Sequence, residues 1–454
     1  MNHAAGSESV TVVGAGLAGA LLSILLARRG HRVRLYERQD DMRRVDLDAG
    51  RSINLALAAR GIRALELAGV MQQVQPLLIP MPGRMLHDLN GALTFVPYGQ
   101  RPDEVIYSVS RPGLNRVLLD AAERAGVEVV FRNPAVGADF QRGRVIFRND
   151  VTQQLHEVEM QRVVAADGAG SVLRRTMVEQ LQTPCTEDLL KHGYKELTLP
   201  PSREGQTRID KQALHIWPRG GFMLIALPNI DGSFTVTLFL PLTGADSFET
   251  LIAPASIESF FSRHFPDALA LMPDLAREFL GHPTGIMGTV RCQQWSVEDH
   301  LLLIGDAAHA ITPFHGQGMN CCFEDCRELD QLLTHSNDWA TTFREFETSR
   351  RPNTNAIAAM AIENYLEMRD TVRDPKFHLH KALSLELERR HPNRFVPRYS
   401  MVMFHDAIPY AVAYERGRIQ DEILTALTRK ADDLAAVDFA AAARSIEQRL
   451  PPLP

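Results

Sequence analysis

The first forty residues change their hydrophobic spacing twice. Val10–Val13 is a short β-branched run, Leu17–Ala27 is apolar over about three helical turns, and a second apolar run ends at Glu37. This order predicts a strand, a helix and a second strand. A membrane helix or a signal sequence is an alternative for the uncharged stretch 9–27. Its glycines, its β-branched opening and the lack of a preceding Lys or Arg favour the strand–helix–strand unit.

The pattern also predicts the later elements, with β-type alternation in the middle of the chain and helical spacing towards its end. The expected elements are a helix over Leu55–Gly69, a strand over Val105–Ser110, a helix over Pro112–Ala125, a strand over Val127–Phe131, a hairpin-like stretch over 136–158, a buried strand over Val163–Ala166, antiparallel strands at Phe222–Leu227 and Ser233–Leu240, short helices over Ser256–Leu280, a buried strand over Leu301–Ile304, and helices from about 322 to Leu450.

The turn between the first strand and its helix is rich in glycine. Gly14 permits a tight turn, Gly16 lets the backbone approach a pyrophosphate, and Gly19 lets helix and strand pack closely. The helix N-terminus then offers N–H groups to phosphates. Glu37 lies 21 residues past Gly16, where it can accept a hydrogen bond from a ribose hydroxyl. The full motif, Gly14-Ala15-Gly16-Leu17-Ala18-Gly19, therefore predicts a dinucleotide site, and no second such motif follows.

The composition narrows the class of protein. At 454 residues, 45% hydrophobic and 23% charged, the chain matches a soluble globular protein with two or three structural units. Its net charge of −6 gives no reason to expect nucleic acid or an anionic membrane as a partner. Five cysteines show no disulfide framework and suit a reducing cytoplasm. Cys321, Cys322 and Cys326 lack paired zinc-site spacing, so we interpret them as small buried residues on a helix rather than metal ligands.

Two later motifs bear on the identity of the nucleotide. Asp167-Gly168 follows a buried strand, and Gly305-Asp306 follows another. Asp306 is placed to accept a hydrogen bond from a ribityl hydroxyl. Backbone N–H groups in Gly316–Gly318, near a helix start, would stabilise negative charge on a reduced flavin. The alternative is that Asp167 and Asp306 only cap their loops.

The order of these three motifs resembles the single-component FAD-dependent aromatic hydroxylases, from residue 10 to about 330. Further segments resemble the kynurenine 3-monooxygenase family in particular, so that the resemblance covers nearly the whole chain. These segments are Gly50–Leu57, Met81–Asp88, Tyr107–Arg111, Phe222–Phe239, Pro313–Asn320, Glu363–Asp370 and Arg398–Ser400.

The resemblance implies an α/β fold with a discontinuous Rossmann-like FAD-binding domain, an inserted antiparallel substrate sheet and a helical C-terminal region that covers the active site. The expected boundaries are 1–75, 100–180 and 285–330 for the FAD-binding domain, 76–99 and 181–284 for the substrate sheet, and 331–454 for the helical region.

The resemblance also implies residues for each part of the site. Substrate contacts are expected from Arg84 and Tyr98 on the carboxylate, from Asn364 and Tyr399 as further polar contacts, and from Ile225, Leu227, Phe239, Phe314 and Met368 around the aromatic ring. FAD contacts are expected from Gly14, Gly16, Leu17, Ala18, Gly19, Glu37, Arg38, Ala56, Arg111, Asp306, Gly318, Met319 and Asn320. We interpret His315 as a polar spacer or pocket wall rather than an acid–base residue, and His309 as a packing and hydrogen-bonding residue rather than a metal ligand.

The implied reaction is hydroxylation of L-kynurenine to 3-hydroxykynurenine with NADPH and O2, through a flavin C4a-hydroperoxide. The amino group of the substrate already activates its ring, so we assign no acid–base residue, and we expect NADPH to dock transiently. No metal is expected. Alternatives are a related flavin hydroxylase acting on another aromatic acid, or a non-catalytic flavoprotein.

The last helices carry charge rather than the membrane anchor expected of eukaryotic relatives. The segment Gln420–Leu450 is charged and amphipathic. We therefore expect a soluble, cytoplasmic enzyme of bacterial type with no membrane partner. The oligomeric state is left open, with a homodimer as one alternative.

Overall fold

The computed structural model describes residues 8–44, 54–370, 375–429 and 431–453. The chain divides into two compact units, each assembled from three separate stretches. Unit 1 comprises Met1–Leu78, Val109–Leu189 and Gly288–Asn355, and unit 2 comprises Ile79–Ser108, Leu190–Met287 and Ala356–Pro454.

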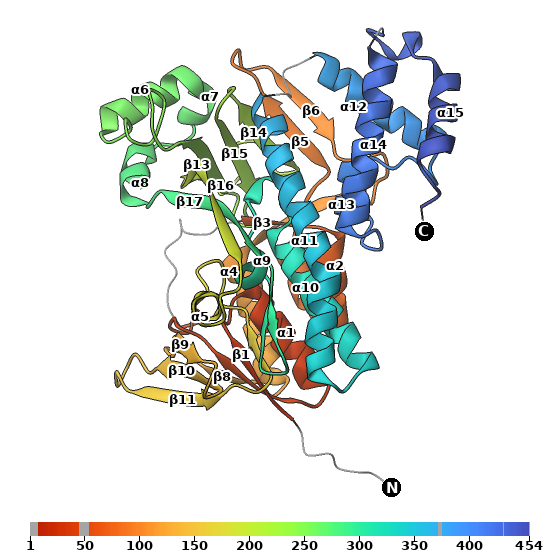
Figure 1. Cartoon of the computed structure of the whole chain (residues 1–454). Helices are drawn as coiled ribbons and strands as arrows, with labels where there is room; N and C mark the ends of the chain where they lie inside the picture. The colour runs from red at the N-terminus through yellow and green to blue at the C-terminus, as the bar shows by residue number, and fades with distance from the viewer. Residues whose placement is uncertain (1–7, 45–53, 371–374, 430, 454) are drawn as a thin grey trace. The chain divides into compact units, whose positions relative to one another are not determined.

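Unit 1 begins with the predicted strand–helix–strand unit, which the structure confirms (Figure 1). The strands β1 (Ser9–Val13) and β2 (Arg32–Tyr36) pair in parallel, and α1 (Leu17–Arg28) connects them. Both strands belong to a six-stranded sheet with the order β18-β19-β12-β1-β2-β8. Because the strand order reverses direction beside β1, the carboxyl end of β1 is a topological switch point, where ligands of such sheets bind.

The other elements of unit 1 complete this sheet, add a small antiparallel sheet and supply helices that pack on α1. Their bounds are β3 Asn54–Leu57, α2 Ala59–Leu67, α3 Met71–Val74, η1 Gln75–Leu77, α4 Arg111–Arg124, β8 Glu128–Val130, β9 Ala135–Asp139, β10 Arg144–Arg148, β11 Leu155–Glu159, β12 Val163–Ala165, α5 Val172–Leu181, β18 Ser296–Val297, β19 Leu301–Leu303, α9 Asp306–His309, η2 Pro313–His315 and α10 Gly318–His335.

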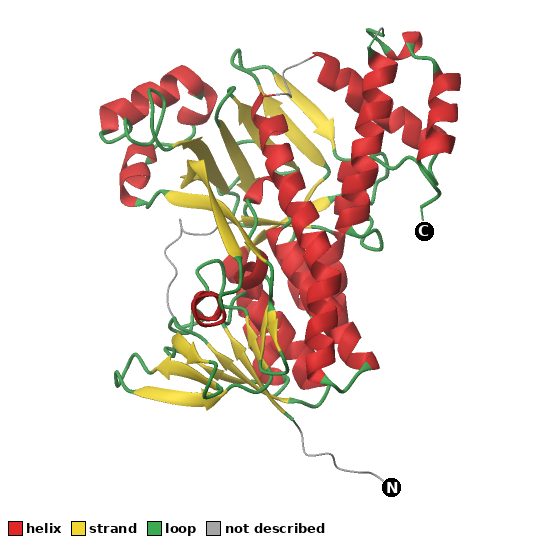
Figure 2. Ribbon diagram, viewed as in Figure 1, coloured by secondary structure: helices red, strands yellow, loops and turns green. Residues whose placement is uncertain are grey.

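Unit 2 is built on a seven-stranded sheet with the order β17-β13-β16-β15-β14-β5-β6 (Figure 2). One face of this sheet packs against α6–α8 to form an aromatic-rich core that includes Trp217, Phe234 and Phe260. The bounds are β4 Ile79–Met81, β5 Gly83–His87, β6 Leu93–Pro97, β7 Ile106–Ser110, β13 Cys185–Leu199, β14 Ala213–Pro218, β15 Met223–Pro228, β16 Phe234–Pro241, α6 Pro254–His264, α7 Pro266–Leu269, α8 Leu275–Gly281 and β17 Gly285–Cys292.

The C-terminal part of the chain is helical, as predicted, and α12, α14 and α15 share a separate small core around Leu387 and Ile446. No helix within the described residues combines the length and apolarity that a bilayer span requires. The bounds are α11 Trp339–Asp370, α12 Pro375–Arg390, α13 Arg398–Phe404, α14 Tyr410–Thr428, η4 Leu434–Ala436 and α15 Phe439–Arg449.

The structure differs from the expected elements at three points. The predicted helix over Leu55–Gly69 is wrong at its start, because residues up to Leu57 form strand β3 and the helix begins at Ala59. The helical region expected from 331 is divided between the two units inside α11. Cys185 and Cys292 form a disulfide, although no disulfide framework was expected. These two cysteines are 107 residues apart, and only the pairing of β13 with β17 brings them together.

Part of one sequence feature lies outside the described residues. Residues 45–53 include the beginning of the segment Gly50–Leu57, which contributed to the family resemblance.

Candidate functional site

The glycine turn of unit 1 has the geometry that a bound dinucleotide requires. Gly14 has a φ of +99°, and a Cβ atom there would collide with the backbone of Ala166. A Cβ on Gly19 would collide with the carbonyl oxygen of Gly14, so the close approach of α1 to the turn requires glycine. A Cβ on Gly16 would meet no described atom within 4 Å. The backbone is therefore open at Gly16, the position expected to face a pyrophosphate.

Glu37 lies beside this turn, at the end of β2. Its Oε2 accepts a hydrogen bond of 2.8 Å from the backbone N–H of Ala15, and its Oε1 accepts one of 2.9 Å from Gln39. Each carboxylate oxygen has a second lone pair, which leaves Glu37 able to accept from a ribose hydroxyl as well. Asn115 donates from Nδ2 to the Ala15 carbonyl oxygen at 3.2 Å. Side chains therefore bond both the N–H and the carbonyl oxygen of Ala15, within the turn.

The third motif brings a second set of backbone N–H groups into unit 1. Asp306 begins the short helix α9, directly after Gly305, whose φ is +61°. Gly316 also has a positive φ, of +66°, and precedes α10. The side chain of Asn320 donates to the carbonyl oxygens of Ala56 and Gly316 at 2.8 and 2.9 Å. This amide therefore ties β3 to the turn at Gly316, and the first turn of α10 carries N–H groups that lie outside the hydrogen bonds of the helix itself.

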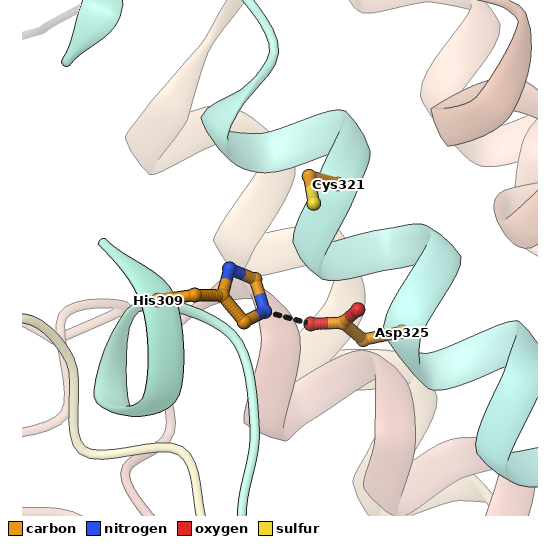
Figure 3. Close-up of side chains that lie close together, drawn as sticks. All are labelled: His309, Cys321 and Asp325. Atoms are coloured by element: carbon orange, nitrogen blue, oxygen red, sulfur yellow. Dashed lines mark hydrogen bonds and ion pairs between the residues drawn. The ribbon is translucent and has the colours of Figure 1, made fainter. Parts of the chain in front are cut away.

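A buried ionic network connects two residues of α10 with residues of neighbouring helices. His309 Nε2 is 2.5 Å from Asp325 Oδ2, and Figure 3 shows the two side chains pointing toward one another. Arg350 on α11 bonds Asp325 through Nε at 2.7 Å and Glu324 through Nη1 at 2.7 Å. Arg60 on α2 forms an ion pair with Glu324. Burial raises the pKa of Asp325, but the charges of His309 and Arg350 outweigh it and hold that pKa below its usual range.

The same network bears on a metal site. The ligand atoms of His309, Cys321 and Asp325 lie within 4.8 Å of one another, as in a metal centre. However, Arg350 already neutralises Asp325, and burial raises the pKa of the Cys321 thiol well above its usual value. A thiolate ligand is therefore disfavoured. The hydrogen-bonding role predicted for His309 is confirmed.

The second motif has a capping role. Asp167 Oδ2 accepts a hydrogen bond of 2.9 Å from Val172 N, and Ser171 Oγ accepts one of 3.0 Å from Arg174 N. Both side chains cap the start of α5. Burial raises the pKa of Asp167. Capping by Asp167 is compatible with both interpretations of this residue made from the sequence.

In unit 2, the predicted ring-contacting residues of the sheet share one face. Ile225 is opposite Thr237 and Leu227 is opposite Thr235, while Phe239 is opposite Met223. Residues paired across strands, and residues two apart along a strand, point to the same side. Ile225, Leu227 and Phe239 therefore lie on the sheet face opposite the aromatic-rich core, as the alternation predicted.

Arg84 lies on this same face and is enclosed by two tyrosines. Its guanidinium carbon is 5.3 Å from the ring centre of Tyr98 and 4.9 Å from that of Tyr399, and the two rings are nearly parallel. Burial raises the pKa of the Tyr98 hydroxyl, which therefore remains a proton donor. Arg84 and Tyr98 are buried, and the guanidinium interacts with the phenols of Tyr98 and Tyr399. A buried arginine and phenol of this kind fit a carboxylate.

Two charged residues near Arg84 were not predicted from the sequence. Lys381 on α12 and Glu367 on α11 both interact electrostatically with its guanidinium. Burial, with the Arg84 charge, lowers the pKa of Lys381 to about 8. Glu367 follows Asn364 by three positions, so the two share a face of α11. A lysine and a glutamate on helices carry no sequence signal that separates them from surface residues.

The remaining predicted residues are distributed between the units. Asn364 and Met368 are buried in unit 2, where Asn364 Nδ2 is 3.2 Å from Met368 Sδ. Phe314 and His315 are buried in unit 1, in the turn η2. Of the expected FAD contacts, Leu17, Ala18, Ala56 and Gly318 are partly buried, Met319 is buried, and Arg38 and Arg111 are exposed. Their roles in binding stay predictions.

Comparison with known proteins defines the class first. A family model described as FAD binding domain matches residues 7–357, so the protein belongs to this family of FAD-binding proteins. Within that class the chain belongs to the kynurenine 3-monooxygenase family. It is 48% identical over 449 residues to the kynurenine 3-monooxygenase of Stenotrophomonas maltophilia, with 98% of each chain covered. It is 47% identical over 446 residues to that of Myxococcus xanthus, with 98% of this chain and 96% of the relative covered. The family predicted from the sequence is confirmed.

Solved structures support the fold class. A tetrameric 2-methyl-3-hydroxypyridine-5-carboxylic acid oxygenase aligns with a TM-score of 0.67 at 22% identity, covering 82% of this chain and 95% of that one. PqsL of P. aeruginosa, in complex with 2-aminobenzoylacetate, aligns with a TM-score of 0.64 at 20% identity, covering 81% and 98%. At these identities the likeness concerns the fold, which agrees with the predicted α/β class.

Proposed function

We propose that the protein is an FAD-dependent monooxygenase that uses NADPH and O2 to hydroxylate L-kynurenine to 3-hydroxykynurenine. The observation that carries this proposal is the buried Arg84, enclosed by Tyr98 and Tyr399 on the apolar sheet face that also bears Ile225 and Leu227. An amino acid with an aromatic ring requires both features, a charged contact for its carboxylate and an apolar wall for its ring. The names of the relatives support the same substrate.

The donors around Arg84 suit a carboxylate at neutral pH. The charge of Arg84 is retained, because the nearby Tyr399, Tyr98 and Glu367 raise its pKa despite the burial that lowers it. Burial keeps Tyr98 protonated, so the substrate would receive a charged and a neutral hydrogen bond. Removing water from this contact strengthens it and fixes the ring against the apolar wall.

The glycine turn of unit 1 fits the pyrophosphate of FAD. Gly14 and Gly19 leave no room for a Cβ, Gly16 opens toward free space, and Glu37 stands beside the turn as a ribose acceptor. The first turns of α1 and α10 would offer N–H groups to the pyrophosphate and to the flavin ring, respectively. FAD, when bound, supplies the redox chemistry with O2, whereas the chain supplies binding, orientation and exclusion of water.

The direct test is an assay of NADPH oxidation by the purified FAD-loaded protein, with and without L-kynurenine. We expect stimulation by L-kynurenine and a product heavier by one oxygen atom in mass spectrometry. Stimulation by other aromatic acids but not by L-kynurenine would indicate a related flavin hydroxylase. Equal oxidation of NADPH with and without any aromatic acid would contradict monooxygenase function.

Substitution of Arg84 tests the carboxylate contact. Arg84→Ala should raise the KM for L-kynurenine by about a hundredfold, because it removes a desolvated charged contact worth about 2–3 kcal/mol. FAD content, measured by flavin absorbance, should be unchanged, since the glycine turn lies in unit 1. Arg277→Ala, at an exposed arginine of the same unit, is the matched control and should leave the KM unaltered. An unchanged KM in Arg84→Ala would rule out this contact.

A further inference from the structure

A chain of hydrogen bonds runs through two buried histidines on the sheet face opposite Arg84. Asp267 Oδ2 is 2.9 Å from His87 Nδ1, His87 Nε2 is 2.8 Å from His215 Nδ1, and His215 Nε2 is 2.7 Å from the backbone carbonyl oxygen of Asp210. Trp217 Nε1 also donates to Asp267 Oδ2, at 2.8 Å. Both histidines are almost completely buried. The proposed reaction assigns no role to either histidine.

The hydrogen-bond partners fix the number of protons in this chain. The Asp210 carbonyl oxygen only accepts, so His215 Nε2 must carry a proton. Asp267 Oδ2 accepts from Trp217 Nε1, and its side chain is one-third exposed to solvent, so the carboxylate is ionised at neutral pH. The ionised carboxylate requires a second proton, on His87 Nδ1. The contact between His87 Nε2 and His215 Nδ1 requires a third proton, on one of these two nitrogens. Two neutral imidazoles have only two N–H groups, so the pair holds one extra proton and one positive charge.

The surroundings place this charge on the ring nearer to Asp267. Burial lowers the pKa of His215 to about 4. His87 instead stacks on Trp217 with ring centres 3.9 Å apart, and an indole face favours a cation. Either losing this extra proton or gaining another would break a hydrogen bond of the chain. Loss of the proton leaves one of the three acceptors without a donor, and a second proton sets two N–H groups against each other.

Other charged and titratable groups lie near His87 and its partners. Arg219, which follows β14, donates from Nη1 to the His87 carbonyl oxygen at 2.9 Å. The same guanidinium donates to the carbonyl oxygen of His264 at the end of α6. His264 lies 3.7 Å from Asp246, and burial lowers its pKa. Asp88, the residue after β5, receives a weak contact of 3.5 Å from Arg219 at its carbonyl oxygen. Of these carboxylates, only Asp267 contacts the imidazole pair.

The histidine pair anchors the element that carries the carboxylate contact. His87 is the last residue of β5, and Arg84 precedes it by three positions on the opposite face. The strand β6 pairs with β5 at the sheet edge and leads directly into Tyr98. Within the sheet, the β5–β6 hairpin has β14 as its one neighbour. The hydrogen bonds that join His87 to β14 and α7 therefore attach the hairpin to the aromatic-rich core, on the sheet face opposite Arg84.

We propose that His87 and His215 are positioning residues that share one extra proton, compensated by Asp267, and thereby hold the β5–β6 hairpin so that Arg84 and Tyr98 bind the substrate carboxylate. This inference rests on the proposed function for its effect on substrate binding. The proton count itself does not depend on that function.

The first test is the substitution Asp267→Asn, which keeps a hydrogen-bond acceptor but removes the compensating charge. We expect the KM for L-kynurenine at pH 7.5 to rise by about three- to tenfold, the equivalent of one weakened charged hydrogen bond. The value should recover as the pH is lowered, because the extra proton then returns without Asp267. The kcat should change little, since the hairpin affects binding. A KM profile that coincides with the wild-type profile across pH would overturn the proposal.

The matched control is Asp274→Asn, an exposed aspartate of the same unit that is paired with Arg277. It makes the same chemical change and should leave the KM profile unaltered. Far-ultraviolet circular dichroism establishes that both variants are folded. If Asp267→Asn is unfolded and Asp274→Asn is folded, the second test decides the proposal.

The second test counts protons in the wild-type protein without reference to activity. Nitrogen-15 NMR of histidine-labelled protein, with His87→Gln used for assignment, should show three protonated nitrogens among the four of His87 and His215 at pH 7. Two protonated nitrogens would overturn the proposal. If L-kynurenine fails to stimulate wild-type NADPH oxidation, the proposed function fails, and this count still decides the proton-sharing inference.

Discussion

Lys381 is largely buried, and burial disfavours the charged form of its side chain. Burial and the neighbouring Arg84 lower its pKa to about 8 from the usual 10.5, and Glu367 only partly offsets them. Between these two values the unfolded chain binds more protons than the folded one. The contribution of Lys381 to the free energy of unfolding therefore rises with pH across this window. At neutral pH the lysine is charged, and it adds a second cation beside the expected carboxylate contact.

Substitution of Lys381 should remove this pH dependence. At pH 7.5, Lys381→Met should unfold at a higher urea concentration than the wild type, because no buried charge remains. The difference should shrink towards pH 10.5, where the wild-type lysine is neutral in the folded state and half neutral in the unfolded state. Lys211→Met, at an exposed position of the same unit, provides the control and should not reproduce this decrease with pH. A Lys381→Met difference that stays constant with pH would contradict the shifted pKa.

Several single residues were predictable because their constraint is local. Gly14 adopts a positive φ, and Gly19 must approach the carbonyl oxygen of Gly14, five residues earlier. Their spacing alone therefore predicted the turn. Lys381 and Glu367 acquire their meaning from Arg84, which is almost three hundred residues away in sequence. No local pattern distinguishes such residues from ordinary surface charges.

At the scale of elements, the ionic network joins four helices of unit 1. Glu324 and Asp325 on α10 bind Arg350 of α11, Arg60 of α2 and His309 of α9. All five side chains are buried. Buried charges of this kind add little net stability as a set, but removal of one partner leaves the others unpaired in a medium of low dielectric constant.

Substitution of Arg350 tests the network. Arg350→Met should destabilise the protein by about 3–5 kcal/mol, since Glu324 and Asp325 would lose a shared cation in the interior. Thermal unfolding followed by circular dichroism measures this change. Arg344→Met, at an exposed residue on the same helix, is the control and should shift stability by at most about 0.5 kcal/mol. An unfolding temperature equal to that of Arg344→Met would show that the network carries no such role.

The predicted elements were reliable where one period dominates a long stretch and less so where two elements meet. The helix α1 and the alternating strands β15 and β16 were expected at nearly their observed bounds. Strand β3 has only four residues and leads within two residues into α2, so the apolar residues of both merged into one expected helix. The His87–His215 contact was invisible for another reason, since it depends on the pairing of β5 with β14 across 128 positions.

At the scale of the whole molecule, one covalent link encloses a large part of unit 2. The disulfide joins Cys185, at the start of β13, to Cys292, at the end of β17. The residues between them include 190–287, one of the three stretches that form unit 2. Beside the disulfide, Gln293 N donates to the Pro184 carbonyl oxygen at 2.9 Å, and Arg291 pairs with Asp188 at 2.7 Å. These contacts hold the two chain segments together on either side of the sulfur atoms.

A disulfide that closes a loop of 107 residues removes chain entropy from the unfolded state, which corresponds to about 4–5 kcal/mol of stability. Cys292→Ser should therefore lower the thermal unfolding temperature by several degrees, and a dithiol reductant should lower that of the wild type to the same value. Cys326→Ser, at a buried cysteine that forms no disulfide, is the control: reductant should still destabilise it. A wild-type unfolding temperature that reductant leaves unchanged, with both thiols detected by alkylation and mass spectrometry, would show that Cys185 and Cys292 are unlinked in solution. The two chain segments beside the sulfur atoms would then be joined by the Arg291–Asp188 pair and the hydrogen bond from Gln293 to Pro184.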